Sequence, residues 1–590
     1  MQKQRAHIGQ HGPEPLESGG TRFRLWAPDA RQVSLVIVGA QTLPMTPAGD
    51  GWYSVEAPYG AGTLYRFLID GELQVPDPAS RAQAGDIHGP SMVLDTRNDY
   101  LWRNTRWCGR PWHETVLYEL HVGLYGGFAA IEAHLAGLAE LGVTAIELMP
   151  IAEFPGDRNW GYDGVLPYAP EAAYGSPEEL KHLIDTAHGL GLMVFLDVVY
   201  NHFGPDGNYL GRYARHFFRH DQQTPWGDAI DFRRREVRDF FIDNALMWLM
   251  DYRFDGLRFD AVHAISDRSF LAELAERVHA TVEPGRHVHL VLENEDNRAS
   301  LLTRGFTAQW NDDGHNVLHT LLTGERQGYY ADYHQDATAK LSRFLGEGFV
   351  YQGQANRRGE ARGEPSGHLP PTSFVLFLQN HDQTGNRAFG ERLVSLADAD
   401  ALRAATAVLL LSPMVPLLFM GEEWGARQPF LFFTSHHGEL ADAVREGRRG
   451  EFAEFAEFAD EATRERIPDP NALSTFENSR PDFGARQEPG HAEWHALYRE
   501  LLGIRHREIV SRLAGARFLE SRVLAEAAVL ARWQLGDGSQ LCLQLNLGTR
   551  AAPLPAASAP GELLFARREA IASGDQLAPR MARLYLEKAT

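Results

Sequence analysis

The fold is decided by residues 254–262, Phe254-Asp255-Gly256-Leu257-Arg258-Phe259-Asp260-Ala261-Val262. The stretch begins as an apolar, strand-like run and ends with an arginine and an aspartate two positions apart. Because side chains alternate along a strand, Arg258 and Asp260 point to the same face. A carboxylate beside a guanidinium stays ionised and is oriented by it, which is one way to build a nucleophile at a strand end. A structural ion pair that closes the strand explains the same residues equally well, so this stretch alone leaves both interpretations open.

Three further apolar runs also end on an acid, and each is followed by loop-forming residues. They are Phe195–His202, which contains Asp197, His289–Glu293, and Phe377–Asp382. A barrel of parallel strands places its active site at the carboxyl ends of the strands, so four acids there converge on one pocket. Isolated core strands do not explain this pattern, because acids are seldom buried without a function.

The composition is that of a soluble globular protein, with 590 residues of which 44% are apolar and 23% charged. A chain of this length is expected to form two to four domains. The formal charge of −21 argues against nucleic acid or an anionic membrane as a partner, and it is compatible with a neutral substrate.

The sequence also bears on location. Cys108 and Cys542 lie far apart and imply no disulfide framework, which suits a reducing cytoplasm. The first residues, Met1–Arg5, run into polar sequence without an apolar core, so no signal peptide is expected. No apolar run approaches the roughly 20 residues of a transmembrane helix. We therefore expect a cytoplasmic protein, and either a monomer or a homodimer.

Residues 1–105 have the alternation of a β-domain, for example in Thr21–Pro28. Short strands with regular turn signals predict a β-sandwich. Two roles are open for it: carbohydrate binding through aromatics such as Trp26 or Trp52, or packing that shapes the cleft of the next domain. We favour the packing role.

Strands and helices alternate from residue 106 to residue 510. Ser176-Pro177-Glu178-Glu179 is typical of a helix start, with Ser176 as the cap and Glu179 completing a capping box. Eight strand–helix units predict a (β/α)8 TIM barrel, and residues 511–590 predict a small C-terminal antiparallel β-sandwich. The eight candidate strands are Val116–His121, Val143–Leu148, Leu192–Asp197, Phe254–Asp260, His287–Glu293, Phe306–Asn311, Phe374–Gln379 and Val415–Met420.

Two long segments interrupt the alternation, at 203–231 and 352–371. Long loops on a barrel are usually functional or disordered. We expect the first, which follows the third strand, to form a wall of the cleft. The second precedes the seventh strand. A short loop there would lie on the face of the barrel opposite the cleft, but this segment is long enough to extend away from that face. The aromatic repeat at 451–458 predicts an irregular helical segment docked on the barrel.

Asp260 and Glu293 are the candidates for the two carboxyl groups of a retaining glycosidase, which lie about 5–5.5 Å apart. Their strands are neighbours in the barrel, with axes about 4.8 Å apart. We expect Arg258 to keep Asp260 ionised for attack. The apolar strand and nearby carboxylates should raise the pKa of Glu293, as an acid catalyst requires. Asp382 is expected to bind sugar hydroxyls and to favour an oxocarbenium-like transition state.

A metal centre is the alternative chemistry. Asp197, Asn201 and His202 are ligand types, but no histidine pair stands at a metal-binding spacing backed by a second acid. We expect no catalytic metal, while a structural calcium stays open. No phosphate-binding glycine motif follows a strand, so no cofactor is expected. His202 and His381 are interpreted as donors to sugar hydroxyls or as cleft residues bonded to the acids.

Four stretches, in order, resemble the four sequence regions of the alpha-amylase family of glycoside hydrolases: Asp197–His202, Gly256–Asp260, Glu293 and Asn380–Asp382. The leading β-domain resembles the N-terminal modules of branching and debranching enzymes in that family. The resemblance implies that Asp260 is the nucleophile, Glu293 the general acid/base and Asp382 the transition-state stabiliser. It also implies an aromatic platform under the sugar, Tyr162. The residues expected to bind substrate are Asp197, Asn201, His202, Arg258, His381, Trp310, Asp313, Gln383, Asn386, Arg387 and Tyr162.

Within that family the chain resembles the trehalohydrolase subgroup. Glu293–Asn297 lacks the Glu-Pro-Trp type of debranching enzymes, Leu378–Arg387 differs from branching enzymes, and Trp310–His315 matches the subgroup. One departure is the loop at Leu124–Phe128, which is shorter than expected at the border of the cleft. The resemblance implies hydrolysis of the α-1,4 bond next to the terminal trehalose of malto-oligosyltrehalose. A glycogen branching or debranching enzyme, or a non-catalytic glucan-binding barrel, are the alternatives.

Overall fold

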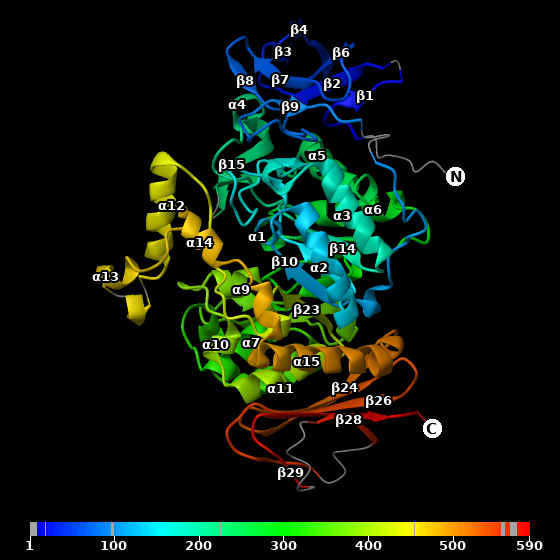
Figure 1. Ribbon diagram of the computed structural model, residues 1–590, viewed down its shortest axis with the longest axis vertical. Helices are drawn as coiled ribbons and strands as arrows, with labels where there is room; N and C mark the ends of the chain where they lie inside the picture. The colour runs from blue at the N-terminus through cyan, green and yellow to red at the C-terminus, as the bar shows by residue number, and fades with distance from the viewer. Residues whose placement is uncertain are drawn as a thin grey trace.

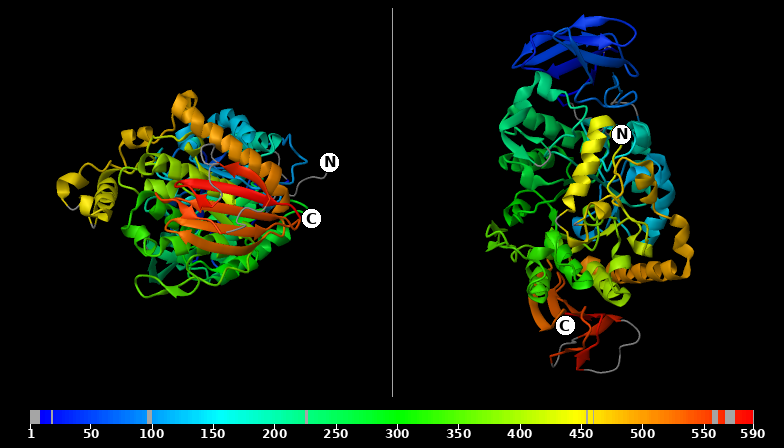
Figure 2. Two further views of the ribbon diagram at one scale, coloured as in Figure 1. Left: turned by 90° about the horizontal axis from the view of Figure 1, so that it is seen from below. Right: turned by 90° about the vertical axis from the view of Figure 1, so that its left-hand side faces the viewer.

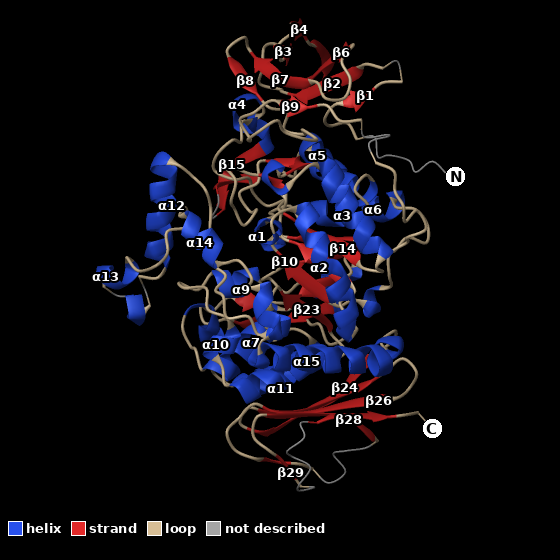
Figure 3. Ribbon diagram, viewed as in Figure 1, coloured by secondary structure: helices blue, strands red, loops and turns tan. Residues whose placement is uncertain are grey.

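The computed structural model describes residues 9–17, 19–95, 100–224, 227–453, 455–458, 460–555, 561–566 and 575–589. Three parts follow one another along the long axis: an N-terminal β-domain, a central barrel wrapped in helices, and a C-terminal sheet (Figure 1). Strands dominate the two ends and helices the middle (Figure 3). Met1–Arg5, for which no signal peptide is expected, lies outside the described residues.

The N-terminal domain consists of two small antiparallel sheets, ordered β1-β2-β6-β5 and β4-β3-β7-β8, with β9 beside β7. Alternate residues of β2 are buried, and Phe23 meets Tyr65 of the other sheet at 4.8 Å between ring centroids. The predicted β-sandwich is confirmed. Its strands are β1 Glu14–Pro15, β2 Thr21–Trp26, β3 Val33–Ile37, β4 Thr42–Pro44, β5 Thr46–Gly49, β6 Trp52–Ala57, β7 Leu64–Ile69, β8 Leu73–Val75 and β9 Ser91–Met92.

The tryptophans of this domain face the barrel. Trp26 contacts Phe217 at 6.4 Å between ring centroids, and Trp52 contacts His11 at 5.2 Å. His11 is in turn 3.1 Å from Asp243 in the barrel. These contacts support the packing role that the sequence favoured for the domain.

Eight parallel strands close into the predicted barrel, in chain order around the ring. Every second residue of a strand points inward, and the inward apolar side chains form a separate core. Each of the eight predicted strands overlaps one observed strand, and β14 alone ends one residue beyond its predicted range. They are β10 Leu117–Leu120, β11 Ala145–Leu148, β14 Met193–Val198, β17 Gly256–Phe259, β18 His289–Leu292, β19 Ala308–Trp310, β22 Phe374–Phe377 and β23 Val415–Phe419.

Helices surround the barrel and extend beyond it. The capping box predicted at Ser176 and Glu179 is present, with both reciprocal hydrogen bonds. The helices are α1 Val122–Tyr125, α2 Phe128–Leu141, α3 Pro177–Gly189, α4 Leu210–Tyr213, α5 Arg235–Met250, α6 Ser269–Thr281, α7 Asp312–Thr323, α8 Ala337–Glu347, α9 His381–Gly385, α10 Leu393–Leu396, α11 Ala399–Leu411, α12 Gly438–Glu451, α13 Glu461–Arg464, α14 Leu473–Asn478 and α15 Pro489–Ile504.

The segments that interrupt the barrel form hairpins and an arm. The segment that follows β14 carries a hairpin, and so does 352–371, where Arg362 reaches the carbonyl of Glu295 at 2.7 Å. That contact brings 352–371 to the carboxyl face of the barrel. Helices α12 to α14 form an arm, and its Phe452 and Phe458 pack with Ala388. The added strands are β12 Ala152–Glu153, β13 Leu166–Pro170, β15 Phe218–Thr224, β16 Gly227–Ile230, β20 Gln354–Ala355 and β21 Ala361–Arg362.

The C-terminal domain is an antiparallel sheet ordered β24-β25-β26-β30-β28, with a two-stranded sheet of β27 and β29. It covers one end of the barrel region when seen from below (Figure 2), and Trp533 donates to the carbonyl of Leu345 in α8 at 3.1 Å. The strands are β24 Arg517–Ala525, β25 Ala528–Gln534, β26 Gln540–Asn546, β27 Ala552–Pro553, β28 Glu562–Ala566, β29 Gln576–Leu577 and β30 Met581–Glu587. Across the described parts of the chain, no helix has the length and apolarity needed to cross a membrane.

Candidate active site

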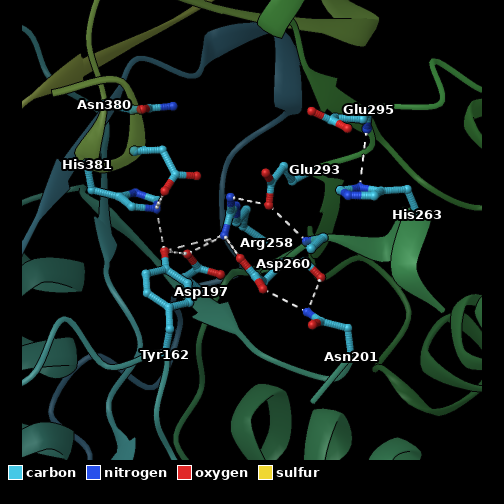
Figure 4. Close-up of polar contacts among 12 residues, drawn as sticks. Tyr162, Asp197, Asn201, Arg258, Asp260, His263, Glu293, Glu295, Asn380 and His381 are labelled. Carbon is cyan, nitrogen blue, oxygen red and sulfur yellow. Dashed lines mark hydrogen bonds and ion pairs between the residues drawn. The ribbon is translucent and has the colours of Figure 1, made fainter. Parts of the chain in front are cut away.

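Three carboxylates meet on the guanidinium of Arg258 at the carboxyl ends of the barrel strands (Figure 4). Nη1 lies 2.6 Å from Asp197 Oδ2 and 3.1 Å from Asp260 Oδ1, and Nη2 lies 2.7 Å from Glu293 Oε2. Asp197 is the register partner of Arg258, while Asp260 and Glu293 directly follow β17 and β18. The acids that the sequence placed at strand ends therefore lie together.

Arg258 is fully buried, and its guanidinium lies 4.2 Å from the ring centroid of Trp310. Burial opposes its charge, but the carboxylates around it outweigh burial and raise the pKa of Arg258 well above its usual value. Trp310 is only 1% exposed. It lies beneath the arginine, and its contact with substrate stays a prediction.

Asp260 is oriented at both oxygens. Oδ1 accepts from Arg258, and Oδ2 accepts from Asn201 Nδ2 at 2.7 Å. Asn201 in turn contacts His202, whose Nε2 lies 3.0 Å from the carbonyl of Tyr162. Burial lowers the pKa of His202, which favours a neutral ring. Asn201 thus holds Asp260 directly, and His202 links Asn201 to the main chain at Tyr162. The role of His202 toward a sugar stays a prediction.

Glu293 is anchored through one oxygen. Oε2 accepts from Arg258 and from the backbone N–H of Ala261 at 2.8 Å, and 15% of the side chain is exposed. Ala261 has a left-handed φ of +42°, and its N–H points toward the neighbouring strand end. The sequence indicated that Arg258 lies beside Asp260. The structure adds that the same arginine also fixes Glu293.

Tyr162 connects the acids to the end of the seventh barrel strand. Its hydroxyl donates to Asp197 Oδ2 at 2.6 Å and lies 2.7 Å from His381 Nε2, and the two rings stack at 5.1 Å. The preceding Gly161 has a φ of +106°, and a Cβ there would lie 2.1 Å from the carbonyl oxygen of Pro150. Glycine is therefore required for the turn that presents Tyr162.

Asp197 is the least accessible of the acids, with 1% of its side chain exposed. Burial raises the pKa of Asp197 to about 7, although the charge of Arg258 opposes this change. The nearby charge of Asp260 adds to the increase. Asp382 is more open, with 35% of its side chain exposed. Desolvation raises the pKa of Asp382 while His381 opposes that change, and Asn386 Nδ2 donates to Oδ1 at 3.2 Å.

Comparison with known proteins agrees with this geometry. Residues 90–242 match the family described as alpha amylase, catalytic domain, residues 9–80 match carbohydrate-binding module 48 (isoamylase N-terminal domain), and residues 516–585 match a domain of unknown function (DUF3459). The malto-oligosyltrehalose trehalohydrolase of Deinococcus radiodurans is 44% identical over 510 residues, which cover 85% of this chain and 83% of that protein. The chain belongs to the malto-oligosyltrehalose trehalohydrolase family.

Other members and structures extend the comparison. The trehalohydrolase of Saccharolobus solfataricus is 39% identical, with 74% of this chain and 79% of that protein covered. A crystal structure of a Salmonella typhimurium protein has a TM-score of 0.92 at 43% identity and covers 99% of this chain and 100% of that one. A pullulanase from Paenibacillus barengoltzii, with a TM-score of 0.72 at 20% identity, shares the fold alone.

Two residues that the trehalohydrolase resemblance marked for substrate binding make hydrogen bonds to protein groups. Asp313 is fully buried and accepts from the backbone N–H groups of Val350 and Tyr351 at 2.7 and 3.0 Å. Its side chain holds residues 350–351 beside α7, and direct contact with a sugar stays a prediction. Arg387 pairs with Glu325 through both terminal nitrogens, each at 2.9 Å.

Gln383 and Asn386 follow Asp382 and keep part of their surface open, with Asn386 the more exposed. Gln383 N–H donates to the side chain of Asn380 at 2.8 Å, which caps α9. These two side chains stay available beside Asp382, and their contact with substrate stays a proposal.

Two acids near the site were not singled out from the sequence. Asp312, adjacent to Asp313, is partly exposed, and desolvation together with Glu293 and Glu295 raises its pKa well above the usual value. Glu119 lies under His381, with Oε2 3.0 Å from its backbone nitrogen. In the sequence, Asp312 could have been found from its position just after a predicted strand. Glu119 could have been found because it is an acid within an otherwise apolar strand. Within the described ranges, no three His, Cys, Asp or Glu side chains are placed so that they could hold a metal ion together.

Proposed function

We propose that the protein hydrolyses the α-1,4-glucosidic bond adjacent to the terminal trehalose of malto-oligosyltrehalose and releases trehalose. The observation that carries the proposal is the pairing of Asp260 and Glu293 with one buried arginine at adjacent strand ends. The names of relatives up to 44% identical supply the substrate class.

In the first step Asp260 attacks the anomeric carbon of the glucose unit that is bonded to trehalose, from the face opposite the leaving oxygen. A carbon–oxygen bond to Asp260 forms, and the bond to the trehalose oxygen breaks. Glu293 donates its proton to that leaving oxygen. Arg258 and Asn201 hold the attacking carboxylate, which reduces the freedom it must lose before the bond can form.

In the second step water attacks the same carbon from the side that trehalose vacated. Glu293, now a carboxylate, takes the proton of the water, and the ester bond to Asp260 breaks. Two inversions give net retention of the α configuration at the new reducing end. No redox change occurs and no cofactor is required in either step.

Asp382 is proposed to balance the positive charge that develops on the sugar ring, with Tyr162 as the platform beneath it. The ring of Tyr162 stacks on His381 and is therefore fixed in direction. Gln383 and Asn386 are proposed to donate to the hydroxyls of the trehalose leaving group. A site that hydrogen-bonds particular hydroxyls rejects analogues that leave those groups unpaired.

We propose further that residues 1–105, 106–510 and 511–590 are the three domains and that the enzyme acts in the cytoplasm as a monomer or homodimer. Free Cys108 and Cys542 support a reducing location. Nucleic acid and membranes are not expected as partners, given the charge of −21.

The proposal is tested by incubating the protein separately with malto-oligosyltrehalose, maltoheptaose and amylopectin and identifying the products. Trehalose and a shortened glucan should appear from the first substrate, with far slower cleavage of the other two. New α-1,6 branch points, or loss of existing ones from amylopectin, would reassign the enzyme to branching or debranching. Glucan binding without any cleavage would identify a non-catalytic barrel.

A further inference from the structure

A carboxylate on the first barrel strand holds the histidine that precedes Asp382. Glu119 is 1% exposed, and its Oε2 accepts the backbone N–H of His381 at 3.0 Å. Its Oε1 lies 2.5 Å from Nδ1 of the same histidine. A single side chain therefore fixes both the main chain and the ring of the residue next to Asp382.

The other ring nitrogen of His381 lies between Tyr162 and Asp382. Nε2 lies 2.7 Å from the hydroxyl of Tyr162 and 3.5 Å from Asp382 Oδ1. The Tyr162 hydroxyl already donates to Asp197, so it accepts from the ring. Both ring nitrogens thus face acceptors, and both are satisfied only when each carries a proton, that is, as the imidazolium.

The surrounding charges favour that state. Burial opposes a charged ring, but Glu119 and Asp382 outweigh it and raise the pKa of His381 to about 9. His121 is buried, which lowers its pKa to about 4 and leaves it neutral. Several titratable and charged groups surround the ring and interact with it: Glu119 from β10, Glu147 from β11, Asp197 from β14, Arg258 from β17, and Tyr162, His121 and Asp382 from the loops and α9.

Glu147 provides a natural comparison for Glu119. The two are register partners on β10 and β11, and both are 1% exposed. Neither oxygen of Glu147 has a hydrogen-bond partner among the described residues, and burial raises its pKa well above the usual value. A neutral carboxyl therefore lies beside a carboxylate that is bonded to the histidine.

We propose that Glu119 is a positioning residue that holds His381 as an imidazolium and thereby keeps Asp382 ionised and directed at the substrate. A carboxylate such as that of Asp382 loses its proton more readily beside a cation than beside a neutral ring. The inference deepens the proposed function and rests on it, because the role of Asp382 belongs to that function.

The direct test is the titration of His381, followed by NMR in the full-length protein labelled at histidine, with the signal identified by its loss in His381→Asn. In the wild type the ring should stay protonated through pH 8. Glu119→Gln should lower its pKa by about two units or more, whereas Glu147→Gln, matched in strand layer and size, should leave it in place. A ring that is neutral at pH 7 in the wild type, or one that titrates alike in Glu119→Gln, overturns the proposal.

The pH dependence of kcat/KM gives the functional readout. Glu119→Gln should shift the alkaline limb to lower pH and reduce kcat at pH 8 by about 10- to 100-fold, while Glu119→Asp, which keeps the charge, should restore much of the wild-type profile. An equal loss in Glu119→Gln and Glu147→Gln with an unshifted profile contradicts the proposal. If Glu119→Gln does not fold, the wild-type titration and Glu119→Asp still decide. Inactivity of the wild type on malto-oligosyltrehalose rejects the proposed function instead and leaves the titration test intact.

Discussion

One guanidinium, that of Arg258, binds three carboxylates, and this determines how single substitutions in the site should affect the fold. Its bonds to Asp197, Asp260 and Glu293 are 2.6 to 3.1 Å long. Replacing one acid by its amide leaves the arginine two anionic partners, so such a change should spare the fold. Replacing the arginine would leave three acids without their cation, and an uncompensated buried charge costs several kcal/mol.

Asp260→Asn should abolish turnover without unfolding the protein. The amide keeps the shape of the side chain but cannot attack the anomeric carbon. We expect kcat to fall by about four orders of magnitude or more, measured on malto-oligosyltrehalose, with an unchanged circular dichroism spectrum. A folded variant that keeps more than about a tenth of wild-type turnover would show that another residue is the nucleophile.

Glu293→Gln should separate protonation of the leaving group from attack. Glu293 is anchored by Arg258 and by the N–H of Ala261, while Glu295 is exposed in the loop. The variant should lose hydrolysis of malto-oligosyltrehalose but retain more activity on aryl glucosides with good leaving groups, which need little protonation. Glu295→Gln is the matched control. If that variant shows the selective loss, the two roles are exchanged.

The sequence was informative at this scale where alternation along a strand decides the direction of a side chain. Arg258 and Asp260 lie two apart and share a face, as expected. It gave no directions for the side chains of Asp312 and Asp313, because successive residues of a helix point about 100° apart and α7 begins at Asp312. Nor did it show that the inward side chain of Trp310 in β19 lies under Arg258. No local sequence pattern distinguishes an aromatic ring that is buried beneath a cleft from one that is exposed in its wall.

At the scale of elements, the α12 arm supports the loop that follows Asp382. Arg448 Nη2 donates to the carbonyls of Gly385 and Arg387 at 2.7 and 3.0 Å. Its guanidinium also lies 4.8 Å from the ring centroid of Phe452 and pairs with Glu451 at 2.9 Å. The loop proposed to contact the trehalose leaving group is thus held from behind by a helix that lies more than fifty residues later in the chain.

Arg448→Met should weaken selection of the trehalose end more than the chemical step. Release of the two carbonyls lets the loop shift, and small displacements of positioning groups can cost about 100-fold. We expect kcat/KM on maltotriosyltrehalose to fall by about 10-fold or more while hydrolysis of α-glucosyl fluoride, which has no sugar leaving group, changes little. Arg449→Met is the control, since Arg449 pairs with Glu446 on the same helix. Equal losses on both substrates for Arg448→Met would contradict a role in leaving-group selection.

The barrel strands could be predicted because each is a short apolar run with its own turn signals, and all eight appear. The arm could not. Its placement depends on contacts such as Arg448 with Gly385, and local periodicity carries no information on such long-range pairs. The hairpin in 352–371 is similar, since only the contact of Arg362 with Glu295 shows on which face it lies.

Over the whole molecule, buried titratable groups link stability to pH. Burial raises the pKa of Glu422 and of Glu423 to about 7. At His381, the charges of Glu119 and Asp382 outweigh burial and raise the pKa to about 9. Where the pKa of an acid is higher in the folded state than in the unfolded state, the free energy of unfolding decreases as pH rises from the unfolded pKa to the folded pKa. For a raised histidine, the contribution is complete below about pH 6.5 and is lost as pH rises through the folded pKa.

Stability should therefore fall between pH 6.5 and 9. Buried histidines with a lowered pKa, such as His121 and His289, act in the opposite direction only below about pH 6.5, because above it they are neutral in both states. Calorimetry across this range should show Tm decreasing steadily with pH at constant ionic strength. A Tm that rises or stays level from pH 6.5 to 9 would mean that the buried acids and His381 do not titrate as described.

The most direct test of the central claim is the ratio of kcat/KM for maltotriosyltrehalose to that for maltopentaose, which has the same number of glucose units. If polar groups beside Asp382 recognise the trehalose end, the ratio should be on the order of a hundred or more. Free trehalose should then appear from the first turnover, with maltotriose as the other product. A ratio near one, with random cleavage of both substrates, would contradict the account.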